Sequence, residues 1–145
     1  MRAVILGCGR VGAKLASMLD AEGHEVTIID RNSDQFRRLD AEFGGTAVVG
    51  TGIDQDILRR AGIEQAEVFI AVTNGDNTNV MAAQIAKHVF GVPRVIARVY
   101  DPEREKTYKN LGLETYCPTT MGVAKIRELM ERPEQVTTAR DRSER

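Results

Sequence analysis

Residues 7–12, Gly7-Cys8-Gly9-Arg10-Val11-Gly12, decide how the rest of the chain is interpreted. They follow a short apolar run at residues 3–6 and open a segment with helical periodicity. In a strand–turn–helix unit the first glycine permits a tight turn, and the second lets backbone N–H groups approach a pyrophosphate. The third lets the helix pack against the sheet. The phosphates then lie at the positive end of the helix dipole. This stretch predicts a dinucleotide-binding turn, and the alternative is a tight turn without a ligand.

An acidic residue roughly 20 positions after the turn strengthens this interpretation. Asp30 ends the predicted second strand, residues 25–29, where a carboxylate would accept hydrogen bonds from the two hydroxyls of an adenosine ribose. Its negative charge repels the 2′-phosphate of NADP and so favours NAD. Arg31 could pair with such a phosphate, which leaves NADP open as an alternative.

Apolar runs alternate with helical segments along the chain. Strands are predicted at 2–6, 25–29, 46–49, 67–72, 94–99 and 114–117. One of the intervening helices, 33–43, would place Phe36, Leu39 and Phe43 inward. This alternation predicts an α/β fold of the Rossmann type, a doubly wound six-stranded parallel sheet with strand order 3-2-1-4-5-6. Ligands of such sheets bind between strands one and four, where the loops 7–12 and 73–77 would face each other.

Composition narrows the class of protein. The 145 residues suit one domain, predicted at 1–132, followed by a polar tail or linker at 133–145 that we expect to be mobile. The formal net charge of −1 gives no electrostatic reason to expect nucleic acid as a partner. No targeting signal or membrane-spanning stretch is apparent, so a cytoplasmic location is expected. We expect no metal site, because the chain has only two histidines and two cysteines. We interpret Cys8 and Cys117 as free thiols, because strands one and six, near whose ends they lie, would not be neighbours.

Several polar residues have both a structural and a ligand-binding interpretation. Arg98 ends a strand that should be buried, so its charge needs a partner, either a ligand phosphate or a carboxylate. Arg10 is placed to reach a terminal phosphate or to lie on the surface. Thr73 and Asn74 suit helix capping, ligand contact or both, whereas Cys8 is interpreted as a packing residue.

The last predicted helix has an apolar face with little sheet left to cover. This face consists of Val123, Ile126, Leu129 and Met130. It is either a contact with a second copy or another lobe, or a face that packs on the edge of the sheet.

Four stretches together resemble the N-terminal domain of the RCK family, also called KTN or TrkA-N. They are Gly7 to Gly12, Ile28-Ile29-Asp30-Arg31, Ala71-Val72-Thr73-Asn74, and Ile96-Ala97-Arg98-Val99 with the following Asp101-Pro102. The resemblance implies binding of NAD or NADH, or alternatively ATP or ADP.

The resemblance also assigns roles to residues. It implies that Gly7 to Val11 hold the phosphates, Asp30 the ribose, and Arg31 the adenine side. Thr73 and Asn74 would line the crevice, with Arg98 near the phosphate or the distal ribose. Thr51 occupies the position after the third-strand glycine where family members often carry an acidic residue near the adenine.

Members of this family are cytosolic regulators of potassium channels and uptake systems. The resemblance implies a dimer, assembly into a ring, a membrane potassium-conducting partner and no catalysis; the family usually adds a second, smaller lobe. The alternatives are the cofactor-binding half of an NAD-dependent oxidoreductase and, more weakly, a methyltransferase-like domain. No acid or base for hydride transfer is recognisable, since Tyr100, Tyr108 and Tyr116 all lack a lysine four residues later. We therefore expect binding of NADH or ATP without dehydrogenase activity.

Overall fold

The computed structural model describes residues 1–134 and contains a six-stranded sheet in the order β3-β2-β1-β4-β5-β6. Every neighbouring pair of strands is parallel. This confirms the predicted doubly wound fold, with the order reversing between β1 and β4. The predicted tail lies, from residue 135 onward, outside the described residues.

The elements follow the predicted alternation. The strands are β1 (Arg2–Leu6), β2 (Glu25–Asp30), β3 (Thr46–Val49), β4 (Val68–Ala71), β5 (Arg94–Arg98) and β6 (Glu114–Tyr116). The α-helices are α1 (Arg10–Ala21), α2 (Gln55–Arg60), α3 (Asp76–Gln84), α4 (Pro102–Asn110) and α5 (Pro118–Glu131). Three short segments complete them: the 3₁₀ helices η1 (Ser33–Arg38) and η2 (Ile63–Gln65), and the π-helical turn η3 (Ile85–Val89), which continues α3.

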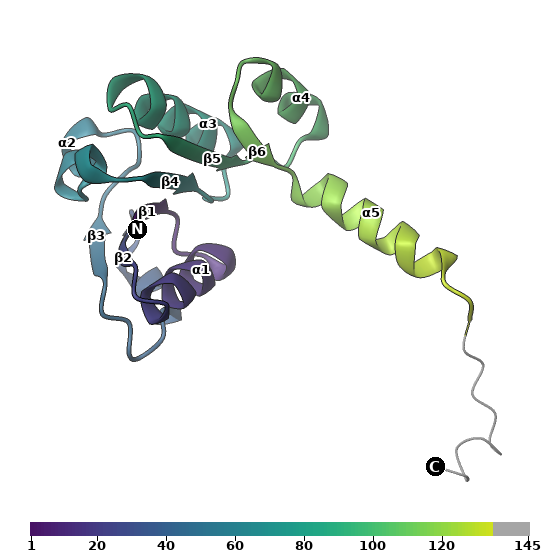
Figure 1. Ribbon diagram of the computed structural model, residues 1–145, viewed down its shortest axis with the longest axis horizontal. Helices are drawn as coiled ribbons and strands as arrows, with labels where there is room; N and C mark the ends of the chain where they lie inside the picture. Colours follow the sequence, from purple (N-terminus) through teal and green to yellow (C-terminus); the bar gives the residue numbers. More distant parts are fainter. Residues whose placement is uncertain (135–145) are drawn as a thin grey trace, which may run out of the picture.

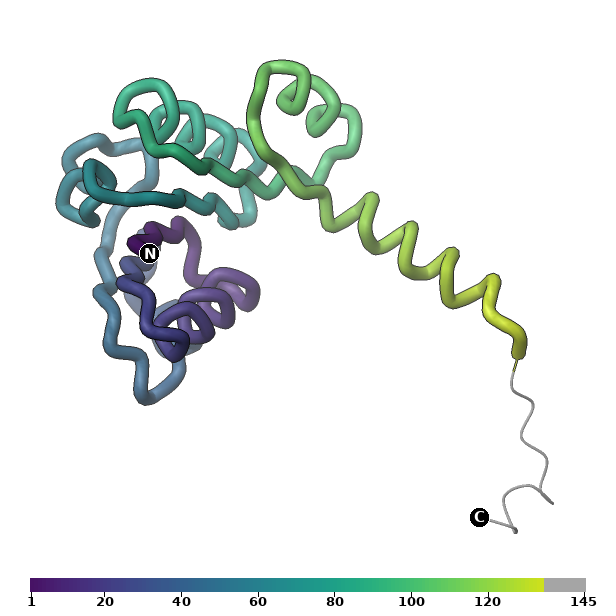
Figure 2. Tube along the Cα trace, viewed as in Figure 1, coloured from purple at the N-terminus to yellow at the C-terminus, as the bar shows by residue number. Residues whose placement is uncertain are grey.

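The helices form unequal layers on the two faces of the sheet. In Figure 1, α1 lies on one side of the sheet, and α2, α3 and α4 lie on the other. The trace in Figure 2 shows α5 leaving the end of β6 and extending away from both layers. One face of the sheet therefore has less helical cover than the other.

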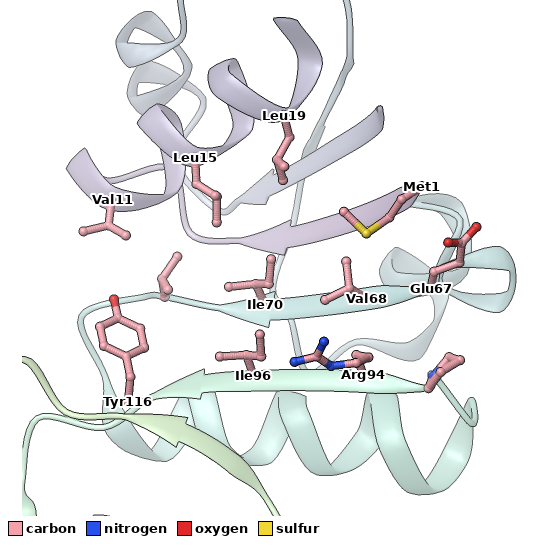
Figure 3. Close-up of a pocket in the computed structure, with 12 residues that line it drawn as sticks. Met1, Val11, Leu15, Leu19, Glu67, Val68, Ile70, Arg94, Ile96 and Tyr116 are labelled. Carbon is pink, nitrogen blue, oxygen red and sulfur yellow. The ribbon is translucent and has the colours of Figure 1, made fainter. Parts of the chain in front are cut away.

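The thinner layer leaves an open groove. The buried face of α1 consists of small residues, Gly12, Ala13, Ala16 and Ser17, so this helix lies close over β1 and β2. Its larger side chains, including Leu15 and Leu19, face the uncovered part of the sheet beside Ile70 (Figure 3). They border a groove of about 920 Å³ that runs over β4 and β5.

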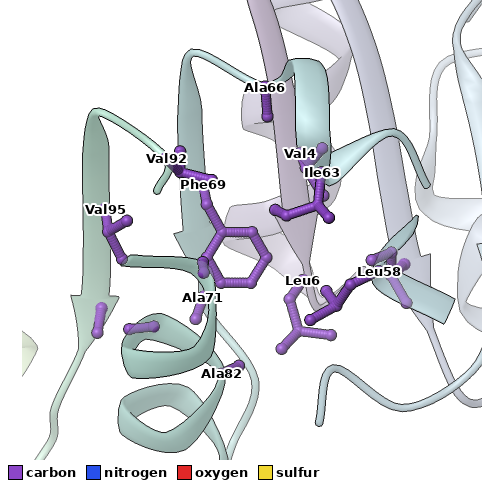
Figure 4. Close-up of a cluster of buried hydrophobic side chains, with 14 of the residues drawn as sticks. Val4, Leu6, Leu58, Ile63, Ala66, Phe69, Ala71, Ala82, Val92 and Val95 are labelled. Carbon is purple, nitrogen blue, oxygen red and sulfur yellow. The ribbon is translucent and has the colours of Figure 1, made fainter. Parts of the chain in front are cut away.

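The opposite face carries the larger hydrophobic core. Phe69 is fully buried among side chains from β1, β4 and the surrounding helices, including Leu6, Leu58 and Ile63 (Figure 4). Burial of such side chains contributes roughly 1.5–3 kcal/mol each. This core fixes the register of the strands whose carboxyl ends carry the glycine turn and the loop after β4.

The predicted helix at 33–43 is wrong in its length. Only η1 is helical, and Leu39 already has an extended backbone. Hydrogen bonds from the Asp40 N–H to Ser17 Oγ and from the Gly44 N–H to Asp20 tie the following segment to α1. Phe36, Leu39 and Phe43 still pack against the α1-side core as predicted. In the segment after η1, hydrogen bonds from the main chain to side chains of α1 thus take the place of further helical hydrogen bonds.

The last helix does not pack on the edge of the sheet. None of its residues is buried, and Val123, Ile126, Leu129 and Met130 are each at least half exposed. Only Cys117 separates β6 from α5, and its backbone is extended. Since a helix needs several connecting residues to reverse direction over a sheet, α5 continues outward instead.

Candidate functional site

The glycine turn has the backbone geometry that its sequence predicts. Gly7 has a φ of +105°, and its N–H donates to the Ile29 carbonyl at 2.7 Å. A Cβ at Gly7 would lie 2.8 Å from the carbonyl oxygen of Val72, and one at Gly12 would collide with the Gly7 carbonyl. Both positions therefore require glycine, the first for conformation and contact with the β4 loop, the second for close approach of α1.

The amino end of α1 is open toward the predicted phosphate position. Gly9 is the N-cap, no side chain accepts a hydrogen bond from the first turn, and that turn contains no acidic residue. A Cβ at Gly9 would meet nothing within 4 Å. Uncapped N–H groups at the positive end of a helix favour an anion, and the open space gives a phosphate access to them. Arg10 and Val11 lie exposed beside this end.

Asp30 lies directly beside the turn. Its carboxylate accepts hydrogen bonds from the Cys8 N–H and from the Asn32 N–H, both at 2.8 Å. The side chain is half-buried, so a ligand hydroxyl can still approach its remaining lone pairs. Arg31, the next residue, is exposed. The spacing of about 20 residues read from the sequence thus corresponds to direct contact between the acid and the glycine turn.

Cys8 is buried under the turn as a protonated thiol. Its Sγ lies 3.3 Å from the Gln35 carbonyl oxygen and donates to it. Burial, and next the negative charge of Asp30, raises the pKa of the Cys8 thiol to about 11, against a lowering effect of Arg38. Only its main-chain N–H faces the carboxylate, so the side chain packs rather than reacts. Cys8 and Cys117 are both free, as predicted.

The loop after β4 forms the opposite wall and is held by a residue that the sequence analysis missed. Asn79, on α3, is fully buried. Its Oδ1 accepts from the N–H of Thr73 at 2.8 Å and from the Thr73 hydroxyl at 2.7 Å. Its Nδ2 donates to the carbonyls of Thr73 and Arg98, both at 3.0 Å. The sequence did contain a signal for this role: Asn79 directly precedes Val80, a residue of the apolar face of the helix, and a buried asparagine needs hydrogen-bond partners. Asn74 lies exposed on the same loop.

Arg98 has two main-chain partners that the sequence did not suggest. Its Nη2 donates to the carbonyl oxygens of Val72 at 2.7 Å and Thr73 at 3.0 Å. The guanidinium carbon lies 4.8 Å from the centre of the Tyr100 ring, a cation–π contact. No carboxylate pairs with Arg98 in the part of the chain that the structure describes. Two backbone carbonyls and an aromatic face thus take the place of a carboxylate, while Nε is buried without a partner.

Thr51 lies exposed in the loop after β3, next to Gly50, whose N–H donates to the Asp30 carbonyl at 3.1 Å. The structure therefore brings the glycine turn, Asp30, Thr73 and the carbonyls held by Arg98 together at the carboxyl ends of β1, β2 and β4. Thr51, Arg31 and Asn74 are exposed on the loops beside these residues. Among residues 1–134 no cluster of His, Cys, Asp and Glu could hold a metal ion.

A parallel sheet with this order, a glycine turn at its reversal point and an acid on the neighbouring strand define a Rossmann-type domain. The sequence model of the TrkA-N domain matches residues 3–117. The chain belongs to the TrkA-N domain family.

A similar sequence is the Trk system potassium uptake protein TrkA of Streptomyces coelicolor. It is 54% identical over 115 residues, which are 79% of this chain and 52% of that protein. The chain thus spans about half the length of this curated relative.

Solved structures share the fold. The GsuK channel bound to NAD matches with a TM-score of 0.75 at 26% identity, over 90% of this chain and 23% of that chain. GsuK bound to ADP gives the same score and identity over 90% of this chain and 34% of that chain. The TrkA-N domain of the Escherichia coli inner membrane protein ybaL, at 22% identity, covers 90% of this chain and 96% of that domain with a TM-score of 0.79.

Proposed function

We propose that residues 1–132 form a nucleotide-binding regulatory domain of a potassium uptake system or channel. The observation that carries the proposal is the open, uncapped amino end of α1 beside the Asp30 carboxylate. The first suits a phosphate and the second a ribose, and a dinucleotide or adenine nucleotide contains both groups. TrkA and GsuK, which this chain resembles, are named for potassium uptake and for a channel.

The proposed ligands are NAD or NADH, with ATP or ADP as the alternative. Gly7, Gly9, Gly12 and the main chain of Cys8, Arg10 and Val11 would surround the phosphates. Asp30 would accept hydrogen bonds from the ribose hydroxyls. Arg31 and Thr51 would lie toward the adenine, and Thr73 and Asn74 would lie on the opposite side of the ligand. Arg98 would contribute through the wall it holds. The GsuK structures bound to NAD and to ADP support both ligand types.

Calorimetric titration of the chain with NAD, NADH, ATP, ADP and NADP tests this proposal. We expect saturable binding of NAD(H) or an adenine nucleotide and weaker binding of NADP, because Asp30 repels a 2′-phosphate. Absence of binding by all five compounds would contradict the proposal. The same samples, incubated with NADH and a panel of carbonyl compounds as hydride acceptors and followed at the NADH absorbance band, test the proposed lack of dehydrogenase activity.

The proposed output is conformational. A nucleotide that binds one arrangement of the protein more tightly than another shifts the population, and such coupling typically amounts to about 1–3 kcal/mol. A membrane potassium-conducting protein would receive this shift at the cytoplasmic face. Within residues 1–134 no helix has the length and apolarity to cross a bilayer.

We also propose self-association, at least to a dimer. Two unpartnered apolar surfaces support it: the face of α5 formed by Val123, Ile126, Leu129 and Met130, and the groove over β4 and β5. Charged side chains elsewhere on α5 form ion pairs within the helix, as Lys125 does with Glu128 and Arg127 with Glu131. Exposed apolar surfaces of this extent are typical of protein contacts.

A further inference from the structure

We propose that Asn79 and Arg98 are positioning residues for the nucleotide. Their side chains form a buried clamp that holds the Val72–Thr73 peptide, the wall of the crevice opposite the glycine turn, in place from behind. The inference rests on the proposed nucleotide binding and names residues that act on the ligand through this wall.

The Asn79 amide has no capacity left for a ligand. Its oxygen accepts two hydrogen bonds from Thr73, and its nitrogen donates to the carbonyls of Thr73 and Arg98. These four bonds use the full donor and acceptor set of an asparagine side chain. Because Asn79 is 0% exposed, all its influence on the crevice passes through Thr73 and Arg98.

Arg98 completes the clamp from the neighbouring strand. The carbonyl oxygen of Thr73 accepts from both Asn79 Nδ2 and Arg98 Nη2, and Arg98 also holds the carbonyl of Val72. The Arg98 side chain is covered by the ring of Tyr100, and its Nε is buried without a partner. The guanidinium thus reaches the peptide wall through Nη2, which makes both of these hydrogen bonds.

The clamped peptide sets the position of the glycine turn. A Cβ at Gly7 would lie 2.8 Å from the Val72 carbonyl oxygen and 2.9 Å from the Thr73 nitrogen. Main chain therefore meets main chain here without an adjustable side chain between them, and close packing transmits small displacements. A shift of the Val72–Thr73 peptide changes the width of the crevice in which the nucleotide would lie.

A positioning role differs from direct phosphate contact in its effect on different ligands. Loss of a direct contact with the terminal phosphate would weaken ADP much more than AMP. Loss of the clamp displaces the wall for every ligand. We therefore expect Asn79→Ala and Arg98→Met each to weaken AMP and ADP by a similar factor, about tenfold.

The experiment measures dissociation constants of AMP and ADP for the full chain by calorimetry, in the wild type, both single variants and the double variant. Because both residues act on one peptide, the double variant should bind about as weakly as the weaker single variant. Ile63→Val is the control, since Ile63 is fully buried next to the amino-terminal end of β4, far along the strand from the crevice. It should lower the melting temperature and leave both dissociation constants unchanged.

The clamp would be overturned if Asn79→Ala bound nucleotide with wild-type affinity. It would also be overturned if the losses of affinity in the two single variants multiplied in the double variant, or if Arg98→Met weakened the binding of ADP alone. Hydrogen exchange of the wild type provides a second measurement that does not depend on the variants folding. Bound nucleotide should slow exchange of the Thr73 N–H, the donor to Asn79, by about tenfold; unchanged exchange on saturation would also overturn the proposal. A wild type that binds no nucleotide contradicts the proposed function instead, so the two failures are distinguishable.

Discussion

Asp30 and Cys8 illustrate how neighbouring residues in one site have separate tasks. The carboxylate of Asp30 and the N–H of Cys8 are joined at 2.8 Å, yet the thiol of Cys8 faces away toward the Gln35 carbonyl. The Asp30 side chain is chemically available to a ribose, whereas the Cys8 side chain fills space below the turn. Substitutions at the two positions should therefore have unequal effects on binding.

Asp30→Ala should weaken binding of the adenosine-containing ligand by about 10- to 100-fold. Hydrogen bonds to a charged group contribute roughly 1.5–3 kcal/mol, which corresponds to that factor. Cys8→Ala should leave affinity nearly unchanged, because it retains the main-chain donor. Calorimetry on both variants measures this difference, and equal losses would show that the roles are assigned wrongly.

The buried thiol also predicts a pH dependence of stability. The folded-state pKa of Cys8, about 11, lies above its ordinary value of 9.0. A raised pKa means that the folded protein retains the proton longer, so this contribution is complete below pH 9 and is lost as pH rises toward 11. The loss should be about 2–3 kcal/mol at most. Urea denaturation between pH 8 and 11 measures it.

Cys8→Ala should make that part of the curve flatter than in the wild type. If both proteins lost stability equally over this range, another group would be responsible.

The helix α1 shows how two glycines of one motif differ. Gly12 touches the turn beneath the helix, whereas Gly9 faces open space. Gly12→Ala should lower the free energy of unfolding by about 1–3 kcal/mol, because overpacking moves the helix off the Gly7 carbonyl. Gly9→Ala should cost less than about 1 kcal/mol, the penalty of alanine at an N-cap. Its methyl group should nevertheless weaken nucleotide binding, because it would occupy the phosphate approach.

Urea denaturation and calorimetry separate these two effects. Normal nucleotide affinity in Gly9→Ala, or normal stability in Gly12→Ala, would contradict the roles given to the two glycines.

Most strands were predictable because they are short apolar runs bounded by turn residues, although β6, Glu-Thr-Tyr, is not. β1, for example, alternates its side chains between two buried faces, so no polar position interrupts it. The end of η1 was not predictable, because the bonds from Asp40 to Ser17 and from Gly44 to Asp20 join segments more than 20 residues apart. Helical periodicity is local and does not contain such contacts.

The same distinction applies to the crevice. The glycine turn and Asp30 carry a motif with fixed spacing, and the structure places them in contact. The partners of Arg98 are carbonyls of the loop after β4 and the ring of Tyr100, which the folded sheet brings near. The sequence correctly predicted that this buried charge needs a partner. It could not predict main-chain carbonyls as the partners, because every residue has a carbonyl and the sequence does not distinguish one from another.

At the scale of the whole molecule, as described by residues 1–134, the apolar face of α5 and the open groove are two surfaces that a single copy leaves uncovered. Sedimentation should show the wild type as a dimer or larger, and Ile126→Lys should shift it toward the monomer, since a charge on the apolar face opposes burial. Met121→Lys is the matched control, because Met121 is equally exposed on α5 but lies outside that face. A wild type that stays monomeric, or equal behaviour of both variants, would contradict self-association through α5.

The single residue between β6 and α5 has a mechanical consequence. Cys117 accepts a hydrogen bond from the Thr120 N–H and donates to the Tyr100 carbonyl, so the helix starts on a tight joint at the edge of the sheet. Fourteen helical residues extend about 21 Å from that joint. A tilt of about 10° at β6 would therefore carry the far end of α5 through about 4 Å. The helix acts as a lever arm, which turns a small rotation of the sheet edge into a displacement comparable to the spacing between two strands.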